Sequence, residues 1–317
     1  MIETFEKCYN NSDFILMEGS LSERLKREFN ILPNSEIALA AHVYNKDSSE
    51  KLLSLFTQYI NIAEKYELPI MITTPTRRAN KERVLSSKFK NNNVMKDNVD
   101  NLLQLKTDKT TAVYVGGLMG CYGDAYNPSE SLSVEESLKL HSWQADLFAK
   151  ANVDFLFAGI MPALSETLGM ARAMEATSLP YIISFMIGKN GRLLDGTTIN
   201  DAIEAIDDST KYKPLCYMTN CVHPQILYSA LSYDFNKTDV VRKRFKGIQA
   251  NTSSLSPEEL DNCSELKTSD FVALTQDMMN LQQKFNLKIF GGCCGTDNTL
   301  LEGIARELRA LGGKKND

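Results

Sequence analysis

The sequence decides its fold between residues 111 and 187, where it reads TAVYVGG (111–117), SVEESLKLHSWQADLFAKA (133–151), VDFLFAG (153–159), SETLGMARAMEAT (165–177) and YIISFMI (181–187). In the two longer segments, apolar residues recur at three- and four-residue spacing, which is typical of helices that bury one face. The three short runs are apolar and rich in β-branched and aromatic residues, which is typical of strands. This alternation predicts βαβ units and a parallel sheet.

The same alternation extends over the rest of the chain, so that about eight strand-like runs are present. The further runs are FILME (14–18), IALAAH (37–42), IMITT (70–74), PLCYMTNC (214–221) and LKIFGG (287–292). We expect a single-domain (β/α)8 TIM barrel over residues 1–317, because helices must cover a parallel sheet and closure removes its edges.

A doubly wound open sheet is the alternative fold. It is disfavoured because EGSLSERL (18–25), after the first run, lacks the G-x-G-x-x-G turn of dinucleotide-binding folds. Residues 234–267 are polar and without clear periodicity, and we expect them to form an extended insertion before the last helix and strand.

Composition favours small-molecule partners. The net charge of −5 is spread along the chain and offers no basic patch for nucleic acid or an anionic membrane. The start of the chain lacks the pattern of a secretory signal, and no apolar run approaches the roughly 20 residues of a membrane helix. We therefore expect a cytoplasmic location, where clustered cysteines indicate a metal site or catalysis more than disulfides.

Two cysteine-containing segments follow predicted strands. TNCVHP (219–224) comes after the predicted seventh strand, and GGCCG (291–295) comes after the eighth. Active sites of these barrels gather at the carboxyl ends of the strands, so Cys221 could meet Cys293 and Cys294 there. Three thiolates would leave one open position on a zinc ion, as in catalytic sites.

Other interpretations of these cysteines remain open on spacing alone. A buried free cysteine often acts as a small apolar residue. The adjacent pair Cys293 and Cys294 could also form a vicinal disulfide or a redox switch. The glycines Gly291, Gly292 and Gly295 are expected to let the backbone turn sharply, so that adjacent side chains can point to one place.

The run IFGGCCGTDNTLLEGIARELR (289–309), with the upstream NC (220–221), resembles the homocysteine S-methyltransferase family, which includes betaine-, S-methylmethionine- and folate-dependent enzymes. Less specific similarities to the family extend over nearly the whole chain. They include MEGSLSERL (17–25), VYVGGLMGCYGDAY (113–126) and GRLLDGTTINDAIEAI (191–206). The resemblance implies transfer of a methyl group to a zinc-bound thiol, with homocysteine as acceptor and methionine as product.

The resemblance also implies roles for individual residues. It assigns zinc to Cys221, Cys293 and Cys294, places Glu18 and Gly19 near the substrate, and suggests that Asn220 helps to orient the site. Zinc lowers the pKa of a thiol, so a thiolate can attack an activated methyl group at neutral pH.

The sequence departs from the family at a position that matters for substrate choice. The family usually has Phe-Glu-Thr at the end of the predicted fifth strand, and the glutamate holds the amino group of homocysteine; here the run is Ala158, Gly159 and Ile160. Glu166 matches a different family position, and we interpret it as a surface or capping residue. Homocysteine is therefore one candidate acceptor, and another thiol is the alternative.

Two other function classes are alternatives. A zinc-binding sensor without turnover would keep the cysteines and lose the amino-acid anchor, whereas a redox protein is disfavoured because its cysteine pair is adjacent rather than C-x-x-C. The methyl donor and the oligomeric state cannot be assigned from the sequence. The sequence also contains weaker candidates: His223 as a further metal ligand, His42 and Thr74 as pocket-lining residues at strand ends, His141 as a structural residue, and Cys8, Cys216 and Cys263 as ordinary free cysteines.

Overall fold

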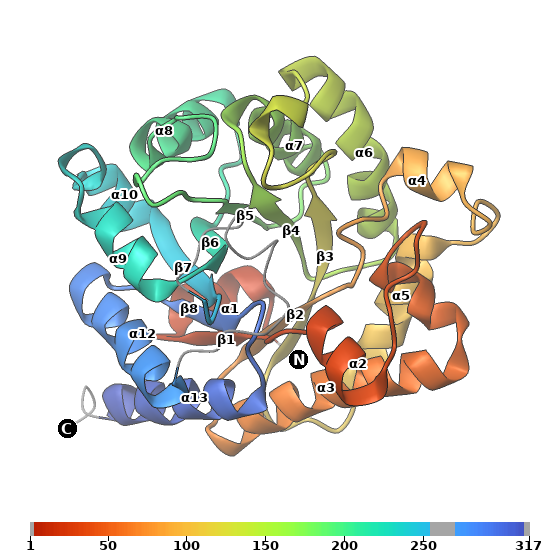
Figure 1. Cartoon of the computed structure of the whole chain (residues 1–317), viewed down its shortest axis with the longest axis horizontal. Coiled ribbons are helices and arrows are strands. Elements are labelled where there is room, and N and C mark those ends of the chain that lie inside the picture. Colours follow the sequence, from red (N-terminus) through yellow and green to blue (C-terminus); the bar gives the residue numbers. More distant parts are fainter. Residues whose placement is uncertain (1–2, 254–269, 314–317) are drawn as a thin grey trace.

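The strands form a closed parallel barrel in sequence order. The computed structural model describes residues 3–253 and 270–313, and within them β1 pairs with β2, each later strand pairs with the next, and β8 returns to β1. The predicted TIM barrel is thereby confirmed, and Figure 1 shows the helices that surround the strands. The strands are β1 (Ile15–Met17), β2 (Ile70–Thr73), β3 (Val113–Gly120), β4 (Phe155–Met161), β5 (Tyr181–Phe185), β6 (Cys216–Val222), β7 (Phe245–Ala250) and β8 (Ile289–Gly292).

The helices other than α1 cover the outer face of the barrel, and several of them begin at a side-chain cap. Ser133, for example, accepts a hydrogen bond from the backbone N–H of Glu136, whose carboxylate accepts one from the Ser133 backbone, so α6 begins with a capping box. The longer helices are α1 (Phe5–Asn11), α2 (Ser22–Phe29), α3 (Lys46–Lys65), α5 (Val94–Leu103), α6 (Val134–Lys150), α7 (Leu164–Glu175), α8 (Ile199–Ser209), α9 (Pro224–Ser232), α12 (Phe271–Phe285) and α13 (Asn298–Gly313). Two shorter helices are α4 (Lys81–Ser86) and α10 (Asp239–Arg244). Among the described residues, no helix has the length and apolar character that a membrane span requires.

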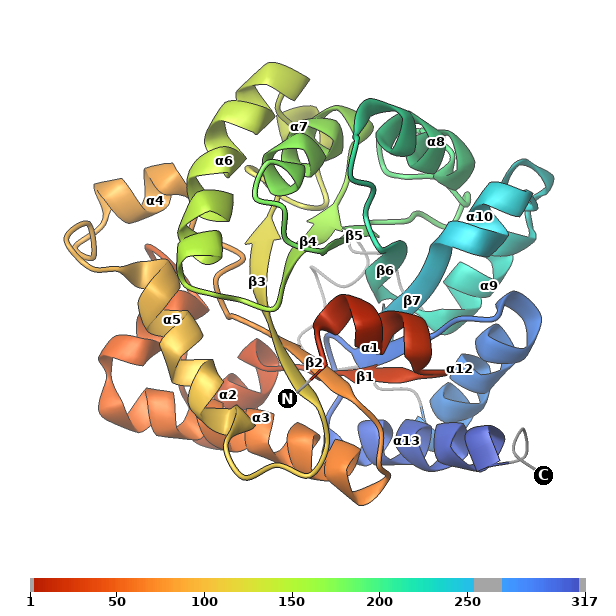
Figure 2. The same ribbon diagram turned by 180° about the vertical axis from the view of Figure 1, so that it is seen from behind.

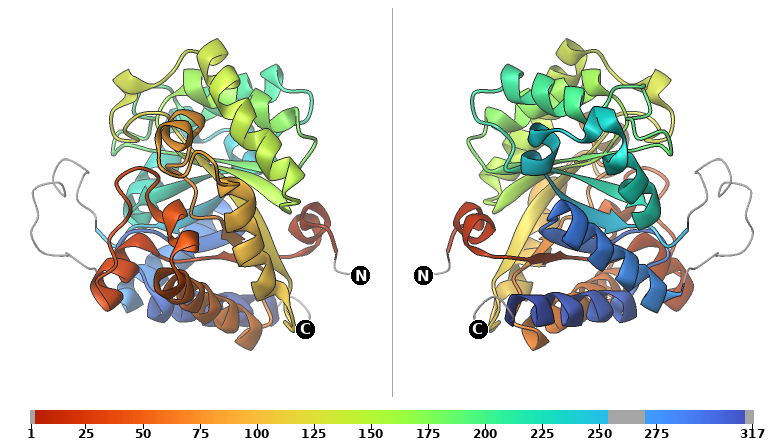
Figure 3. Two further views of the ribbon diagram at one scale, coloured as in Figure 1. Left: turned by 90° about the vertical axis from the view of Figure 1, so that its right-hand side faces the viewer. Right: turned by 90° about the vertical axis from the view of Figure 1, so that its left-hand side faces the viewer.

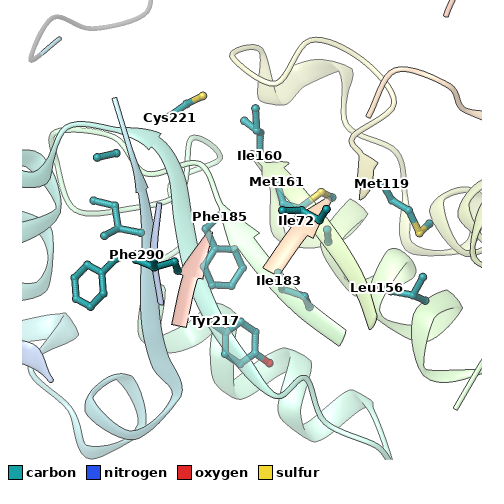
Figure 4. Close-up of a cluster of buried hydrophobic side chains, with 14 of the residues drawn as sticks. Ile72, Met119, Leu156, Ile160, Met161, Ile183, Phe185, Tyr217, Cys221 and Phe290 are labelled. Atoms are coloured by element: carbon teal, nitrogen blue, oxygen red, sulfur yellow. The ribbon is translucent and has the colours of Figure 1, made fainter. Parts of the chain in front are cut away.

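The apolar core has two parts, one inside the barrel and one between the strands and the helices. Figure 4 shows part of it, with Phe185 and Tyr217 among the labelled side chains, whose rings stack at 5.4 Å. Close packing of helix on strand requires glycine at one place: a Cβ at Gly117 would lie 2.6 Å from the ring of Phe148 in α6. Burial of each large apolar side chain stabilises the barrel by about 1.5–3 kcal/mol.

Helix α1 covers the amino-terminal end of the barrel. Figures 2 and 3 show it standing against that end, outside the ring of helices. Phe5 stacks on Phe155 at 4.3 Å and contacts the ring of Tyr114 at 5.2 Å, at the beginnings of β4 and β3. The opposite end, where the strands finish, is therefore the end that can hold a site.

One of the predicted strands is wrong. IALAAH (37–42) is not in the sheet; most of it belongs to the 3-10 helix η1 (Leu39–Tyr44). The Asn34 side chain accepts hydrogen bonds from the backbone N–H groups of Glu36 and Ile37 and folds the chain into a turn. Ala38 then adopts a positive φ of 50°, which an extended strand does not allow.

The strand missing from the prediction is β7, inside the expected insertion 234–267. Its sequence, FKGIQA, is short and broken by lysine, glycine and glutamine, so its apolar pattern is weak. It is stabilised by pairing on both sides, with β6 and β8. The remainder, 254–267, and with it Cys263, lies outside the described residues. Because β7 is present, β6, which carries Cys221, and β8, which leads into Cys293 and Cys294, are not neighbours.

Candidate metal centre

Cys221 is brought to the barrel mouth by an irregular end of β6. The pairing of β6 with β7 shifts between Asn220 and Val222, and Cys221 has a φ of 59°. A left-handed backbone at a non-glycine residue costs about 1–3 kcal/mol and is concentrated at functional sites. Figure 4 shows Cys221 at one end of the buried cluster, near Ile160.

Cys293 and Cys294 lie in the turn that follows β8. The backbone N–H of Cys293 donates to the carbonyl of Ala250 in β7, and the carbonyl of Cys294 accepts from the backbone N–H of Thr252. The turn ends at Gly295, whose φ is 80° and where a Cβ would lie 1.9 Å from the Thr252 hydroxyl. The turn is therefore held against the end of β7, which lies between β6 and β8.

The glycines beside the cysteines have different roles. Of Gly291, Gly292 and Gly295, only Gly295 has a positive φ. It alone therefore makes the sharp turn that we expected of all three. Gly291 and Gly292 instead allow close packing, since a Cβ would lie 2.8 Å from Met17 and 2.2 Å from the Thr296 hydroxyl, respectively.

The three cysteines form a cluster that could hold a metal ion. Their sulfur atoms all lie within 4.8 Å of one another. In a tetrahedral site with Zn–S bonds of about 2.3 Å, the sulfurs are roughly 3.8 Å apart, so the bonded sulfurs of Cys221 and Cys293 would have to separate to hold such an ion. Within the described residues, no other group of three or more histidine, cysteine or acidic side chains has this spacing.

The structure joins Cys221 to Cys293 as a disulfide and leaves Cys294 as a free thiol. The vicinal disulfide that spacing alone left open is therefore not formed. The pair Cys221 and Cys293 has a Cα–Cα distance of 5.4 Å across 72 residues of sequence. Because thiolates are the metal ligands, the reduced form of this pair is the form that can take an ion.

Glu18 is a buried acid at the end of β1, beside the cysteine turn. Its Oε1 accepts hydrogen bonds from the Thr73 hydroxyl at 2.5 Å and the Thr73 backbone N–H at 3.2 Å, whereas its Oε2 is buried without a partner among the described residues. Its backbone carbonyl accepts from the N–H of Gly292. Burial raises the pKa of Glu18 to about 7, and the bonds from Thr73 oppose that rise.

Asn220 joins three strands below the cluster. Its Oδ1 accepts hydrogen bonds from the backbone N–H of Ile160 in β4 at 3.0 Å and from the Ser184 hydroxyl in β5 at 2.5 Å. Ile160 has a φ of 58°, which is rare for a β-branched residue. The Asn220 amide therefore fixes two strained strand ends, its own and that of β4.

Gly19 and Gly159 shape the site because neither has a side chain. Gly19 is buried, and a Cβ there would lie 2.7 Å from the hydroxyl of Tyr59. A Cβ at Gly159 would lie 2.8 Å from the end of Leu118, on the neighbouring strand β3. No carboxylate therefore projects from position 159 of β4.

Glu166 differs from our expectation of a surface or capping residue. It is fully buried in the first turn of α7, where its carboxylate accepts hydrogen bonds from the backbone N–H groups of Tyr122 and Leu132 and contacts His141 Nε2 at 3.0 Å. Glu166 thus holds both ends of the segment between β3 and α6, a role that sequence spacing does not reveal.

The weaker candidates do not join the cluster. His223 caps α9 by accepting from the N–H of Gln225, and Thr74 bonds Thr76 and the N–H of Leu118. His42 lies in η1 rather than at a strand end. Sequence reasoning missed the buried polar partners Thr73 and Ser184; the available signal was a polar residue inside an apolar strand.

A cavity of about 350 Å³ adjoins the cluster. Its lining includes Cys221, His223, the segment 186–190 after β5, and Tyr126 from the segment between β3 and α6. It offers room beside the sulfur atoms for a small molecule.

Comparisons with known proteins agree with this architecture. A family model described as homocysteine S-methyltransferase matches residues 15–308. The metallated form of the homocysteine methyltransferase MmuM from Escherichia coli is similar in structure, with a TM-score of 0.74, 16% identity, and coverage of 94% of this chain and 97% of that one. Its oxidized form gives a TM-score of 0.73 at 15% identity, with the same coverage. No curated protein sequence matches the chain.

The buried carboxyl of Glu18 should make the metal-free, reduced protein less stable as the pH rises. Its folded-state pKa of about 7 lies above the ordinary value of 4.5, so the folded state binds the proton more tightly than the unfolded state does. The resulting destabilisation is absent below pH 4.5 and grows to about 3 kcal/mol above pH 7. Urea unfolding of the parent and of Glu18→Gln at several pH values measures it.

The parent should lose stability relative to Glu18→Gln across this window. Glu6→Gln, which removes an exposed carboxyl from α1, serves as the control and should follow the parent. A constant difference between the parent and Glu18→Gln from pH 4.5 to 7.5 would contradict the assignment.

Proposed function

Because the chain belongs to the homocysteine S-methyltransferase family, we propose that it is a zinc-dependent enzyme that transfers a methyl group to a thiol at the Cys221, Cys293 and Cys294 centre. The family acceptor is homocysteine, which would yield methionine. The observation that carries the proposal is the convergence of three sulfur atoms within 4.8 Å, from strands that the barrel brings together.

The chemistry requires a nucleophilic sulfur and a methyl group on a good leaving group. Bound zinc would lower the pKa of a coordinated thiol and so maintain its thiolate at neutral pH. A sulfur–methyl bond forms while the bond between methyl and its sulfur or nitrogen carrier breaks, and the carrier leaves with the electron pair. The thiol proton is released when the thiol binds.

The protein contributes positioning. Asn220 fixes the ends of β4 and β6, so the Cys221 sulfur is held in place before substrate binds. The unpartnered Oε2 of Glu18 is available to a donor group on the substrate. The cavity beside Cys221 gives a second small molecule, the methyl donor, a place to approach.

The proposal extends to the organisation of the protein. Residues 1–317 would act as one homocysteine-binding-type barrel domain, with a small thiol and a methyl donor as its partners. Free thiolate ligands suit the reducing cytoplasm.

A second candidate function is thiol binding without turnover. Gly159 favours it, because the carboxylate that would hold an amino acid in the family is missing. Methyl transfer measured over a panel of thiols and methyl donors separates the two. Turnover with any pair supports the enzyme, and tight thiol binding without turnover supports the sensor.

We predict that the purified, reduced protein binds about one zinc ion per chain, because three converging thiolates suit a borderline-soft ion. Elemental analysis should show that Cys293→Ser and Cys294→Ser each lose most of the metal. Cys8→Ser removes a thiol from α1, at the opposite end of the barrel, and should keep it. Retention of full metal content by both serine variants at positions 293 and 294 would refute the ligand set.

We further predict weak activity with homocysteine and better activity with 4-mercaptobutyrate, which lacks the amino group. An ammonium buried without a carboxylate costs several kcal/mol. Gly159→Glu should shift the kcat/KM ratio towards homocysteine under one methyl donor. Gly159→Ala adds only the Cβ near Leu118, so it separates the effect of charge from that of crowding.

A parent that already prefers homocysteine strongly, with no gain in Gly159→Glu, would argue against a role of position 159 in specificity. Because the new side chain must displace Leu118, the double variant Gly159→Glu/Leu118→Ala gives it room and is measured beside the single one.

A further inference from the structure

The segment between β2 and α4 carries two arginines that have no partner among the residues that the structure describes. Arg77 and Arg78 are both half-buried. Across residues 3–253 and 270–313, neither guanidinium forms a hydrogen bond, an ion pair or a ring contact. In a chain with a net charge of −5, half-buried unpaired arginines are unusual and indicate a binding role.

The Arg77 side chain lies across the end of β3. A Cβ at Gly120 would lie 2.5 Å from the Arg77 Cγ and 2.7 Å from its backbone carbonyl oxygen, so glycine is required for this contact. Gly120 pairs directly with Gly159 of β4. The arginine stem therefore passes next to the position at which the family has its glutamate.

The end of β4 connects Arg77 to the cysteine mouth. Gly159, which pairs with Gly120, is followed by Ile160, whose backbone N–H donates to Asn220, the residue before Cys221. Arg77 lowers the pKa of the cavity-lining Tyr126, which burial raises to about 12. Arg78 is not among the charges that act on Tyr126, whereas Arg77 and Arg78 both act on Cys121 and on Arg83.

Among the described residues, no acidic group at the mouth contacts Arg77. Glu23 Oε2 accepts a hydrogen bond from the backbone N–H of Gly295, and Glu23 Oε1 lies 3.9 Å from Arg27 Nε. Thr73 donates to Glu18 Oε1, whereas Glu18 Oε2 has no partner among those residues. Asp124 accepts from the backbone N–H of Tyr126. With position 159 a glycine, no described carboxylate neutralises Arg77. An anionic group of a bound molecule would do so, since a guanidinium binds a carboxylate through two parallel hydrogen bonds.

We propose that Arg77 binds the acid group of the thiol substrate, so that the acceptor is an alkanethiol that carries a carboxylate or another acid group. The thiol end enters the cysteine centre and the acid end lies over β3. At this side of the mouth the charge that recognises the substrate is thus reversed. The family has a glutamate that holds an ammonium group, and this chain has an arginine that holds an anion. The inference rests on the proposed function for the thiol end only.

Binding can be measured without turnover. The probes are 4-mercaptobutyrate and its neutral amide, titrated calorimetrically into the metal-loaded, reduced protein. The parent should bind the acid at least tenfold more tightly than the amide. Arg77→Gln should lose most of this preference by weakening binding of the acid, with little change for the amide. Arg77→Lys, which keeps the charge without the paired donors, should lie between them.

Arg78→Gln is the matched control, because it removes the same charge from the adjacent residue and should keep the preference. Equal losses in Arg77→Gln and Arg78→Gln would overturn the proposal in favour of general attraction by the basic segment. An acid preference that survives in Arg77→Gln, or a parent that does not distinguish the two probes, would also overturn it.

Failure of this inference and failure of the proposed function are distinguishable. Methyl transfer to thiols without any acid preference would leave the enzyme intact and refute the role of Arg77. Acid preference that depends on Arg77, without methyl transfer from any donor, would support Arg77 and refute the enzyme.

Discussion

Closure of the sheet between β8 and β1 is the constraint on which the site depends. Leu16 pairs with Phe290, and through this pairing the ends of all strands face one mouth. Cys221 and Cys293 are 72 residues apart in sequence, yet their Cα atoms lie 5.4 Å apart. An open sheet would place β1 and β8 at opposite edges, and the Glu18 carbonyl could not accept from Gly292 in the cysteine turn. The barrel thus supplies the convergence that chemistry requires.

The meeting of the strand ends does not by itself point the sulfur atoms at one another. Strained backbone conformations at single residues also contribute. β7 separates β6, which carries Cys221, from β8 and the cysteine turn that follows it, so the cysteine side chains must extend past the end of β7. Cys221 does this through a left-handed backbone, and Ile160 on β4 has a similar conformation. The Asn220 amide bonds the Ile160 backbone and so links the two strained positions. The strain at these residues costs folding free energy, and it gives the site its geometry before any ligand binds.

The fold and the three cysteines were within reach of sequence analysis, because hydrophobic alternation and an unusual GGCCG turn are local signals. The positions of two strands could not be predicted in this way. IALAAH is apolar, but the Asn34 side chain folds it into a turn. FKGIQA is polar in part, and only its pairing with two neighbours makes it a strand. Glu166 and Arg77 depend on contacts between distant segments, which no spacing within one segment can reveal.

The proposed function requires a catalytic rather than a structural metal site, with three protein sulfurs and one open position for a thiol. X-ray absorption at the zinc edge of the reduced, zinc-loaded protein tests this most directly. We expect three sulfur ligands at about 2.3 Å and one lighter ligand, with a fourth sulfur replacing the lighter one when 4-mercaptobutyrate is added. A coordination shell that does not change on addition of saturating thiol, or one with fewer than three sulfurs, would contradict it.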